Sequence, residues 1–93
     1  MITVNLFGVF GVEAGIKSFD LGLEEGMTAG RAILKIVGQY PVLHKFWVTE
    51  DGDLSEHVLV VLNGVDIHDH PDGLRTVIRN GDRLDFFSPL AGG

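Results

Sequence analysis

Several short clusters of histidine and carboxylate side chains are the first places where this sequence offers chemistry. The run His68-Asp69-His70 is flanked by Asp66 and Asp72, and imidazole and carboxylate groups are common metal ligands. Two imidazoles on one loop do not complete a coordination sphere by themselves, and the other two histidines of the chain are distant in sequence. We therefore interpret the cluster as a solvated loop and expect no metal site.

Paired carboxylates can serve in acid–base catalysis, and the chain has two candidate groups, Glu24-Glu25 and Glu50-Asp51-Gly52-Asp53. The first pair lies just before a predicted helix, where acidic side chains interact favourably with the positive end of the helix dipole. The second group has the composition of a solvated turn. The chain has no cysteine, and no serine or threonine lies in a recognisable nucleophile motif. We expect no catalytic side chain and no enzymatic activity.

The sequence ends in Ser88-Pro89-Leu90-Ala91-Gly92-Gly93, where the group available for chemistry is the main-chain carboxylate of Gly93. Pro89 lacks a backbone N–H, so it is expected to end the last strand. The stretch from Pro89 to Gly93 can extend about 16–18 Å and holds nothing that can pack a core. We expect a domain over residues 1–88 and a flexible tail over residues 89–93.

The composition bounds the class of protein. A chain of 93 residues with 45% hydrophobic residues suits one globular domain with one core. The formal net charge of −6 repels a phosphate backbone, so nucleic acid is not an expected partner, whereas a protein with a basic groove is better matched. No signal peptide pattern and no apolar run of about 18 residues is present, so we expect a cytoplasmic protein without a membrane partner.

The first half of the chain predicts a hairpin followed by a helix. Residues 2–7 and 19–23 alternate between apolar and polar, which is the pattern of half-buried strands. Three glycines between these segments indicate a turn region. Apolar residues at helical spacing over residues 29–39 predict the main helix, with Thr28 as its N-cap and Pro41 preventing its continuation.

The second half predicts the remaining strands. Residues 42–57 have no regular pattern, and Phe46-Trp47-Val48 fits either an extra turn or a short strand. The later elements are expected to be a strand at 58–62, an Asn63-Gly64 turn, a short strand at 65–67, one helical or 3₁₀ turn near 74–78, and a last strand at 83–87 with Leu84 and Phe86 facing inward. The order predicts an α+β fold, a β-grasp (ubiquitin-like) roll with a mixed sheet of about five strands and one main helix on one face.

The residues from Asn80 to Gly93 resemble the ending of the ThiS/MoaD family of sulfur carriers. The shared features are a Gly-Asp turn, a hydrophobic last strand, a proline and a final Gly-Gly, and Leu62-Asn63-Gly64 is similar to the mid-chain turn of that family. Two features depart from its pattern: Ser88 stands where paired prolines are frequent, and residues 42–57 are longer than in the shortest members. The length favours a MoaD-like or archaeal-modifier-like relative over a minimal ThiS protein.

The resemblance implies a carrier whose C-terminal glycine is adenylated and then converted to a thiocarboxylate. Gly93 would carry the sulfur, Gly92 would leave clearance for the attacking nucleophiles, and Pro89, Leu90 and Ala91 would guide the tail. The chain itself would bind no cofactor, because ATP is used by the activating partner, and the sequence accordingly has no phosphate-binding loop of the Walker type.

The expected partners also follow from the resemblance. They are an E1-like adenylyltransferase of the MoeB/ThiF type and either a larger synthase subunit of the MoaE type or a thiazole synthase. We expect a molybdopterin or tungstopterin synthase small subunit. The alternatives are a sulfur carrier for thiamine biosynthesis, a ubiquitin-like modifier conjugated through Gly93, and a β-grasp interaction module whose tail is incidental.

Aromatic residues suggest where a partner would dock. Phe46 and Trp47 are interpreted as core residues. Phe7 and Phe87 fall on the first and last strands, which the predicted fold places side by side, and they are candidates for an exposed apolar patch.

Overall fold

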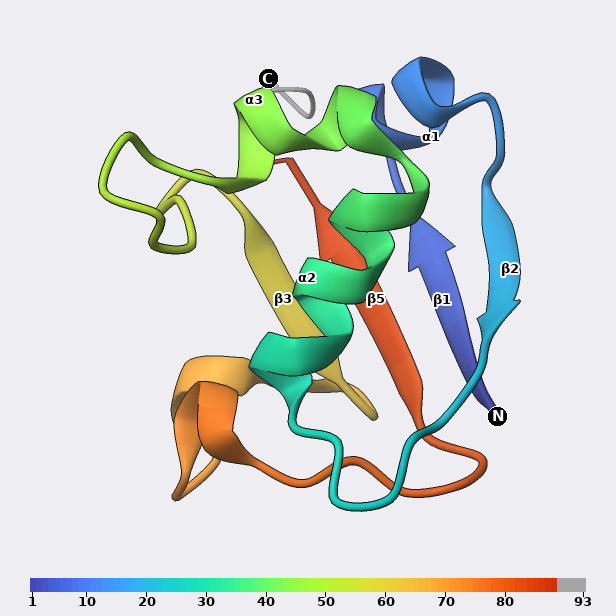
Figure 1. The fold of residues 1–93 in the computed structure, drawn as a ribbon, viewed down its shortest axis with the longest axis vertical. Helices are drawn as coiled ribbons and strands as arrows, with labels where there is room; N and C mark the ends of the chain where they lie inside the picture. The colour runs from blue at the N-terminus through green and yellow to red at the C-terminus, as the bar shows by residue number, and fades with distance from the viewer. Residues whose placement is uncertain (89–93) are drawn as a thin grey trace.

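The computed structural model describes residues 1–88, so the predicted tail over residues 89–93 lies outside the described part of the chain. Figure 1 shows the arrangement of the elements. In chain order they are β1 (Ile2–Leu6), α1 (Val9–Ala14), β2 (Ser18–Leu21), α2 (Ala29–Gln39), η1 (Pro41–Leu43), α3 (His44–Trp47), β3 (Leu59–Leu62), β4 (Val65–Asp66), η2 (Ile67–Asp69), η3 (Gly73–Arg75) and β5 (Arg83–Phe87).

The strands form one mixed sheet in the order β2-β1-β5-β3-β4. The central strand β5 runs parallel to its neighbour β1, and every other pair is antiparallel. A parallel pair needs a long connection, and the whole chain between β1 and β5 supplies it. Ile2, Val4 and Leu6 alternate inward along β1 and are buried, as the periodicity of the sequence predicted. The β-grasp prediction is confirmed.

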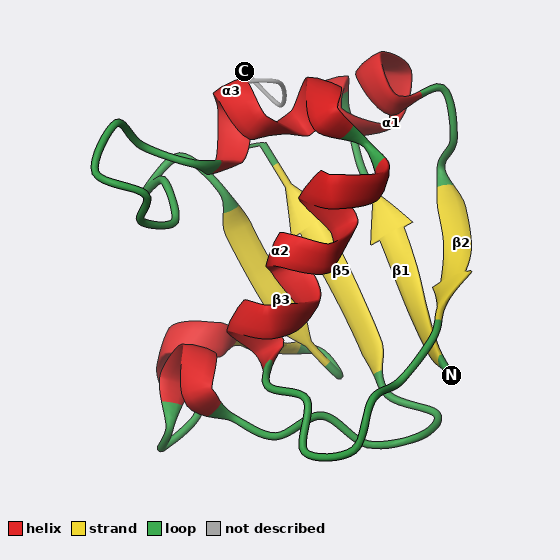
Figure 2. Cartoon of the chain, in the orientation of Figure 1, coloured by secondary structure: helices red, strands yellow, loops and turns green. Residues whose placement is uncertain are grey.

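Helix α2 lies across one face of this sheet (Figure 2). The Thr28 hydroxyl accepts a hydrogen bond of 3.1 Å from the backbone N–H of Arg31, so the first turn is capped as predicted. Ala29, Ala32 and Ile36 are fully buried against the strands. The helix ends at Gln39, because Pro41 cannot continue it and instead opens the short 3₁₀ helix η1.

Helix α1 is a correction to the sequence interpretation, which expected only a turn there. Gly8 and Gly15 adopt positive φ and bound the helix, and Gly15 forms a left-handed C-cap. Burial of Phe10 stabilises the helix. This side chain is 2% exposed and packs edge-on against the Trp47 ring, with 5.5 Å between the ring centroids. Tertiary burial therefore outweighs the low helix propensity of Gly11 within the helix.

Gly11 and Gly38 give a matched test of the packing of these helices. A Cβ at Gly11 would lie 2.8 Å from the Leu6 carbonyl oxygen, whereas a Cβ at Gly38 meets nothing within 4 Å. We expect Gly11→Ala to lower the free energy of unfolding by about 1–3 kcal/mol because α1 must move off β1. Gly38→Ala should raise it by about 0.5–1 kcal/mol because alanine favours the helix. Urea unfolding of both variants measures the difference, and equal midpoints would contradict the close contact at Gly11.

The irregular segment after α2 folds as helical turns, which is the first of the two structures expected for Phe46-Trp47-Val48. Trp47 ends α3, is fully buried, and stacks on Phe86 of β5 at 4.2 Å between centroids and 14° between planes. An isolated bridge between Val48 and Leu54 closes the loop that follows. Helices α1 and α3 both lie at the end of the sheet where β1 and β5 finish (Figure 2).

The remaining boundaries differ from the predictions by small amounts. The second strand is Ser18–Leu21, where residues 19–23 were predicted, and β3 begins at Leu59. Strand β4 stops at Asp66, because the buried Ile67 turns inward and begins η2. None of the helices within residues 1–88 is both long enough and apolar enough to cross a lipid bilayer.

Candidate functional site

The candidate site is the sheet face that points away from α2, here called the open face. Side chains alternate along a strand, so the partners of the buried residues in β1 and β5 fall on this face. The strand register then aligns them in rows across neighbouring strands. The open-face positions of the strands are Thr3, Asn5, Ser18, Asp20, Leu59, Val61, Asp66, Arg83, Asp85 and Phe87, and Phe7 continues the row just after β1.

An apolar patch, made of Phe7, Phe87 and Leu59, forms the row at the end of β5. Leu59 is paired with Phe87 in the β3–β5 ladder, and the backbone N–H of Phe7 donates to the Phe86 carbonyl at 3.0 Å. The Phe7 and Phe87 rings stack with 4.4 Å between centroids and 9° between planes. Phe7 is 42% exposed and Leu59 38% exposed, so the patch faces solvent. The two aromatic residues singled out in the sequence lie together on this face.

The position of the patch relates it to the end of the chain. Phe87 is the last residue of β5, and Ser88 and then Pro89 follow it in sequence. An open pocket of about 600 Å³ adjoins the patch, with Phe7, Gly8, Val12 and Lys17 among its lining residues. The patch and pocket therefore form a candidate docking surface, next in sequence to residues 89–93.

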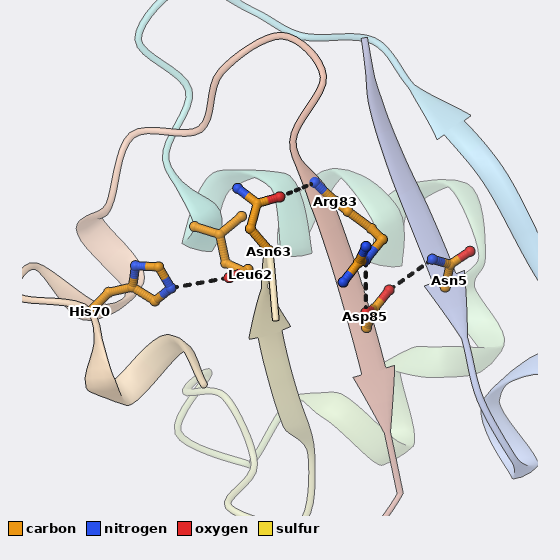
Figure 3. A network of polar contacts seen from close by, with 6 residues as sticks. All are labelled: Asn5, Leu62, Asn63, His70, Arg83 and Asp85. Carbon is orange, nitrogen blue, oxygen red and sulfur yellow. Dashed lines mark hydrogen bonds and ion pairs between the residues drawn. The ribbon is translucent and has the colours of Figure 1, made fainter. Parts of the chain in front are cut away.

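A polar network, whose residues Figure 3 shows, lies at the centre of the open face, one row before the patch along β5. Asp85 is 7% exposed and is the only charged residue buried within residues 1–88. One carboxylate oxygen accepts from Asn5 Nδ2 at 2.8 Å, and the other accepts from Arg83 Nε at 3.1 Å. Sequence reasoning missed this group. The available signal was the pairing of an outward Asn on the first strand with an outward Asp on the last.

The histidine cluster makes structural contacts. The Asp66 carboxylate accepts from the backbone N–H of His68 at 2.9 Å and caps η2. The His70 ring nitrogen Nε2 lies 3.3 Å from the Leu62 carbonyl oxygen and ties this turn to β3 (Figure 3). Among the described residues, no three histidine, aspartate or glutamate side chains are arranged to hold a metal ion.

The two acidic groups also have local partners. Glu24 lies 3.9 Å from both Arg31 Nε and Lys35 Nζ, at the surface of the first turns of α2. In the turn at 49–53, the Thr49 hydroxyl accepts from the backbone N–H of Asp53 at 3.2 Å. These contacts fit the interpretation of a solvated helix start and a solvated turn.

Comparison with known proteins decides the family. The ThiS family matches residues 4–93, which is nearly the whole chain and includes the final Gly-Gly. The chain belongs to the ThiS family. The match confirms the resemblance drawn from the ending of the sequence. Gly93, Gly92, Ala91, Leu90 and Pro89 lie outside the described residues, so their individual roles stay predictions.

Archaeal modifier proteins are among the relatives of this ThiS family member. Small archaeal modifier protein 3 of Haloferax volcanii is 30% identical over 92 residues, which cover 99% of this chain and 98% of that protein. The crystal structure of SAMP1 from the same organism has a TM-score of 0.87 at 28% identity, covering 99% of this chain and 98% of that one.

A chain of the Amycolatopsis orientalis BexX/CysO complex has the same fold, with a TM-score of 0.79 at 23% identity and full coverage of both chains. The family match and the archaeal relatives together place the protein among ubiquitin-like sulfur carriers and modifiers, a group that is generally non-catalytic.

Proposed function

We propose that this protein is a sulfur carrier for cofactor biosynthesis whose reactive group is the carboxylate of Gly93. The observation that carries the proposal is the ThiS family match, which runs through the final Gly-Gly. The Gly-Gly follows β5 by four intervening residues, and β5 ends in the solvent-facing aromatic pair of Phe87 with Phe7. Within that class we favour the small subunit of a molybdopterin or tungstopterin synthase, with a carrier for thiamine biosynthesis as the alternative.

The chemistry requires an activated carboxylate, because oxide is a poor leaving group. In the proposed first step, a Gly93 carboxylate oxygen attacks the α-phosphorus of ATP, and pyrophosphate leaves. The resulting mixed anhydride has AMP as its leaving group. A sulfur nucleophile then attacks the carbonyl carbon and expels AMP. If that nucleophile is a persulfide, a thiol must reduce the acyl disulfide to leave the thiocarboxylate. Glycines at both final positions leave these attacks unobstructed by a Cβ.

The activating site belongs to a partner in this proposal. An E1-like adenylyltransferase of the MoeB/ThiF type would bind ATP, and a MoaE-type synthase subunit or a thiazole synthase would receive the sulfur. The apolar patch of Phe7, Leu59 and Phe87 is suited to such a partner, because it is solvent-facing and adjoins the start of residues 89–93. That a similarly folded chain occurs in the BexX/CysO complex supports a protein partner.

Phe7→Ala tests the patch. Phe7 is 42% exposed, so truncating it should change the free energy of unfolding by less than about 1 kcal/mol. It should weaken binding of the adenylyltransferase by about tenfold or more, because aromatic residues dominate interface energetics. Leu34→Ala is the matched control, since Leu34 is 55% exposed but lies on α2, away from the open face. Calorimetric titration of both variants gives the comparison, and equal affinities would argue against the patch.

The function itself is tested by incubating the protein with ATP and the E1-like enzyme encoded in the same genome. Intact-mass spectrometry should detect a species heavier by one adenylyl group, and fragmentation should locate that group at Gly93. If no cognate enzyme of this class forms the adenylate, the carrier proposal fails.

A ubiquitin-like modifier is the second candidate, because Haloferax volcanii small archaeal modifier protein 3 is 30% identical over nearly the full chain. The same activated Gly93 would then form an isopeptide bond with a lysine of a target protein. Proteolysis of cell extracts followed by mass spectrometry would distinguish the two, since only a modifier leaves lysines bearing a remnant that ends in Gly-Gly.

A further inference from the structure

The buried Asp85 requires an explanation that stability does not provide. Removing a carboxylate from water is costly, and a buried ion pair is seldom better for stability than apolar residues of similar size. Asp85 nevertheless lies at 7% exposure in the middle of the sheet, paired across the ladder with Asn5 on one side and Val61 on the other. Its two oxygens are used by Asn5 and Arg83. The network therefore holds a flexible side chain in a fixed position, and the flexible side chain among the three is that of Arg83.

Hydrogen bonds restrain both the backbone and the side chain of Arg83. Its backbone N–H donates to Asn63 Oδ1 at 2.9 Å, and its carbonyl accepts from the Asn63 N–H at 2.9 Å. Its Nε donates to Asp85 at 3.1 Å, and two residues along a strand share one face, so the side chain lies along the open face (Figure 3). Within residues 1–88, the Arg83 side chain makes one recorded hydrogen bond, the bond from Nε to Asp85. The side chain remains 49% exposed.

The charge of the open face differs from that of the whole protein. The chain has 13 acidic residues, but only three occupy open-face strand positions. Two of these, Asp20 and Asp66, lie on the edge strands β2 and β4, and the third is the buried Asp85. Arg83, at the start of the central strand β5, is consequently the exposed basic side chain of this strand on the open face, although the net charge of the protein is −6. A partner that meets this part of the face is complementary if it carries a carboxylate there.

We propose that Arg83 is a specificity-determining residue that binds a carboxylate of the activating enzyme, and that Asp85 and Asn5 are its positioning residues. Nε is held by Asp85, so the two terminal nitrogens form a preoriented fork, and a guanidinium fork matches a carboxylate in a bidentate contact. Because the side chain is already ordered, binding loses less rotamer entropy than it would with a free arginine. The apolar patch would supply contact area beside this contact, and Arg83 would select the partner.

This inference depends on the proposed function for the identity of the partner. The test therefore uses the E1-like adenylyltransferase that adenylates the unmodified chain, and measures the dissociation constant, the adenylation rate at saturating carrier, and the urea midpoint. Arg83→Gln should weaken binding by about tenfold, the size expected for losing a charge-assisted contact, and should make binding less sensitive to salt. The saturated adenylation rate should stay unchanged, because the contact does not involve Gly93. Arg83→Lys keeps the charge without the fork and should recover only part of the affinity.

A double-mutant cycle separates positioning from a merely structural role. Asp85→Asn keeps the shape and should weaken binding by about threefold to tenfold in the native background, but should have no further effect once Arg83 is glutamine. Arg75→Gln on η3 makes the same change in net charge away from the open face and should bind as the unmodified chain does. Equal effects of Asp85→Asn in both backgrounds, or unchanged affinity of Arg83→Gln, would overturn the inference. Failure of the unmodified chain to be adenylated would instead reject the proposed function.

Discussion

Deleting Gly92 and Gly93 is expected to abolish adenylate formation, with the rate falling by at least about a thousandfold, because the reacting carboxylate would then sit on Ala91 with a side chain and two residues closer to β5. We expect the fold to be unaffected, since both deleted residues are glycines without side chains and the described core is formed by residues between Ile2 and Phe86. Quenched-flow or gel assays of pyrophosphate release with the cognate E1-like enzyme measure the rate.

The matched control for this deletion is Gly93→Ala, which keeps the length of the chain and adds a single methyl group. We expect an intermediate loss, since the methyl group crowds both nucleophilic attacks on the carbonyl carbon. Urea midpoints of both variants should equal that of the unmodified protein. A truncated protein that is adenylated at the native rate would favour the interaction-module alternative, in which the tail is incidental.

Phe86→Ala is expected to have the largest effect on stability, lowering the free energy of unfolding by about 3–5 kcal/mol. Phe86 is fully buried on a central strand and stacks on Trp47, which in turn contacts Phe10. A substitution there opens a cavity between β5, α1 and α3. Because domains of this size have total stabilities of about 5–15 kcal/mol, the variant should be partly unfolded near its growth temperature.

Phe87→Ala provides the comparison, since Phe87 is the next residue but faces the open side of the sheet. Its loss should cost about 1 kcal/mol or less in stability, with the main effect on partner binding. Thermal and urea denaturation of the two variants test the assignment of the two faces. Similar losses of stability from both substitutions would mean that the faces of β5 are wrongly assigned.

Much of the fold could be predicted because its strands and main helix follow periodic patterns of apolar residues in the sequence. The alternation in β1 and β5 and the helical spacing of Ala29, Ala32 and Ile36 depend only on local sequence. Helix α1 could not be predicted in this way, since it is short, contains Gly11, and forms because Phe10 finds a buried site against residues far along the chain. A local pattern contains no information about that distant contact.

The candidate site was partly predictable for the same reason. Alternation indicated that Phe7 and Phe87 face outward on neighbouring strands, which is where the structure places their rings. It gave Asp85 an outward position too, but the burial of its carboxylate depends on Asn5, which the β1–β5 register places beside it, and on the Arg83 side chain of the same strand. The buried carboxylate thus becomes visible only when β1 and β5 are paired.

Intact-mass spectrometry of the protein purified from its native cells under anaerobic conditions tests whether the Gly93 carboxylate carries sulfur. We expect a population heavier by the difference between one sulfur atom and one oxygen atom. Alkylation should consume this species, and fragmentation should locate the change at Gly93. A mature chain that continues beyond Gly93, or a protein that carries no sulfur there while its biosynthetic pathway is active, would contradict the proposed function.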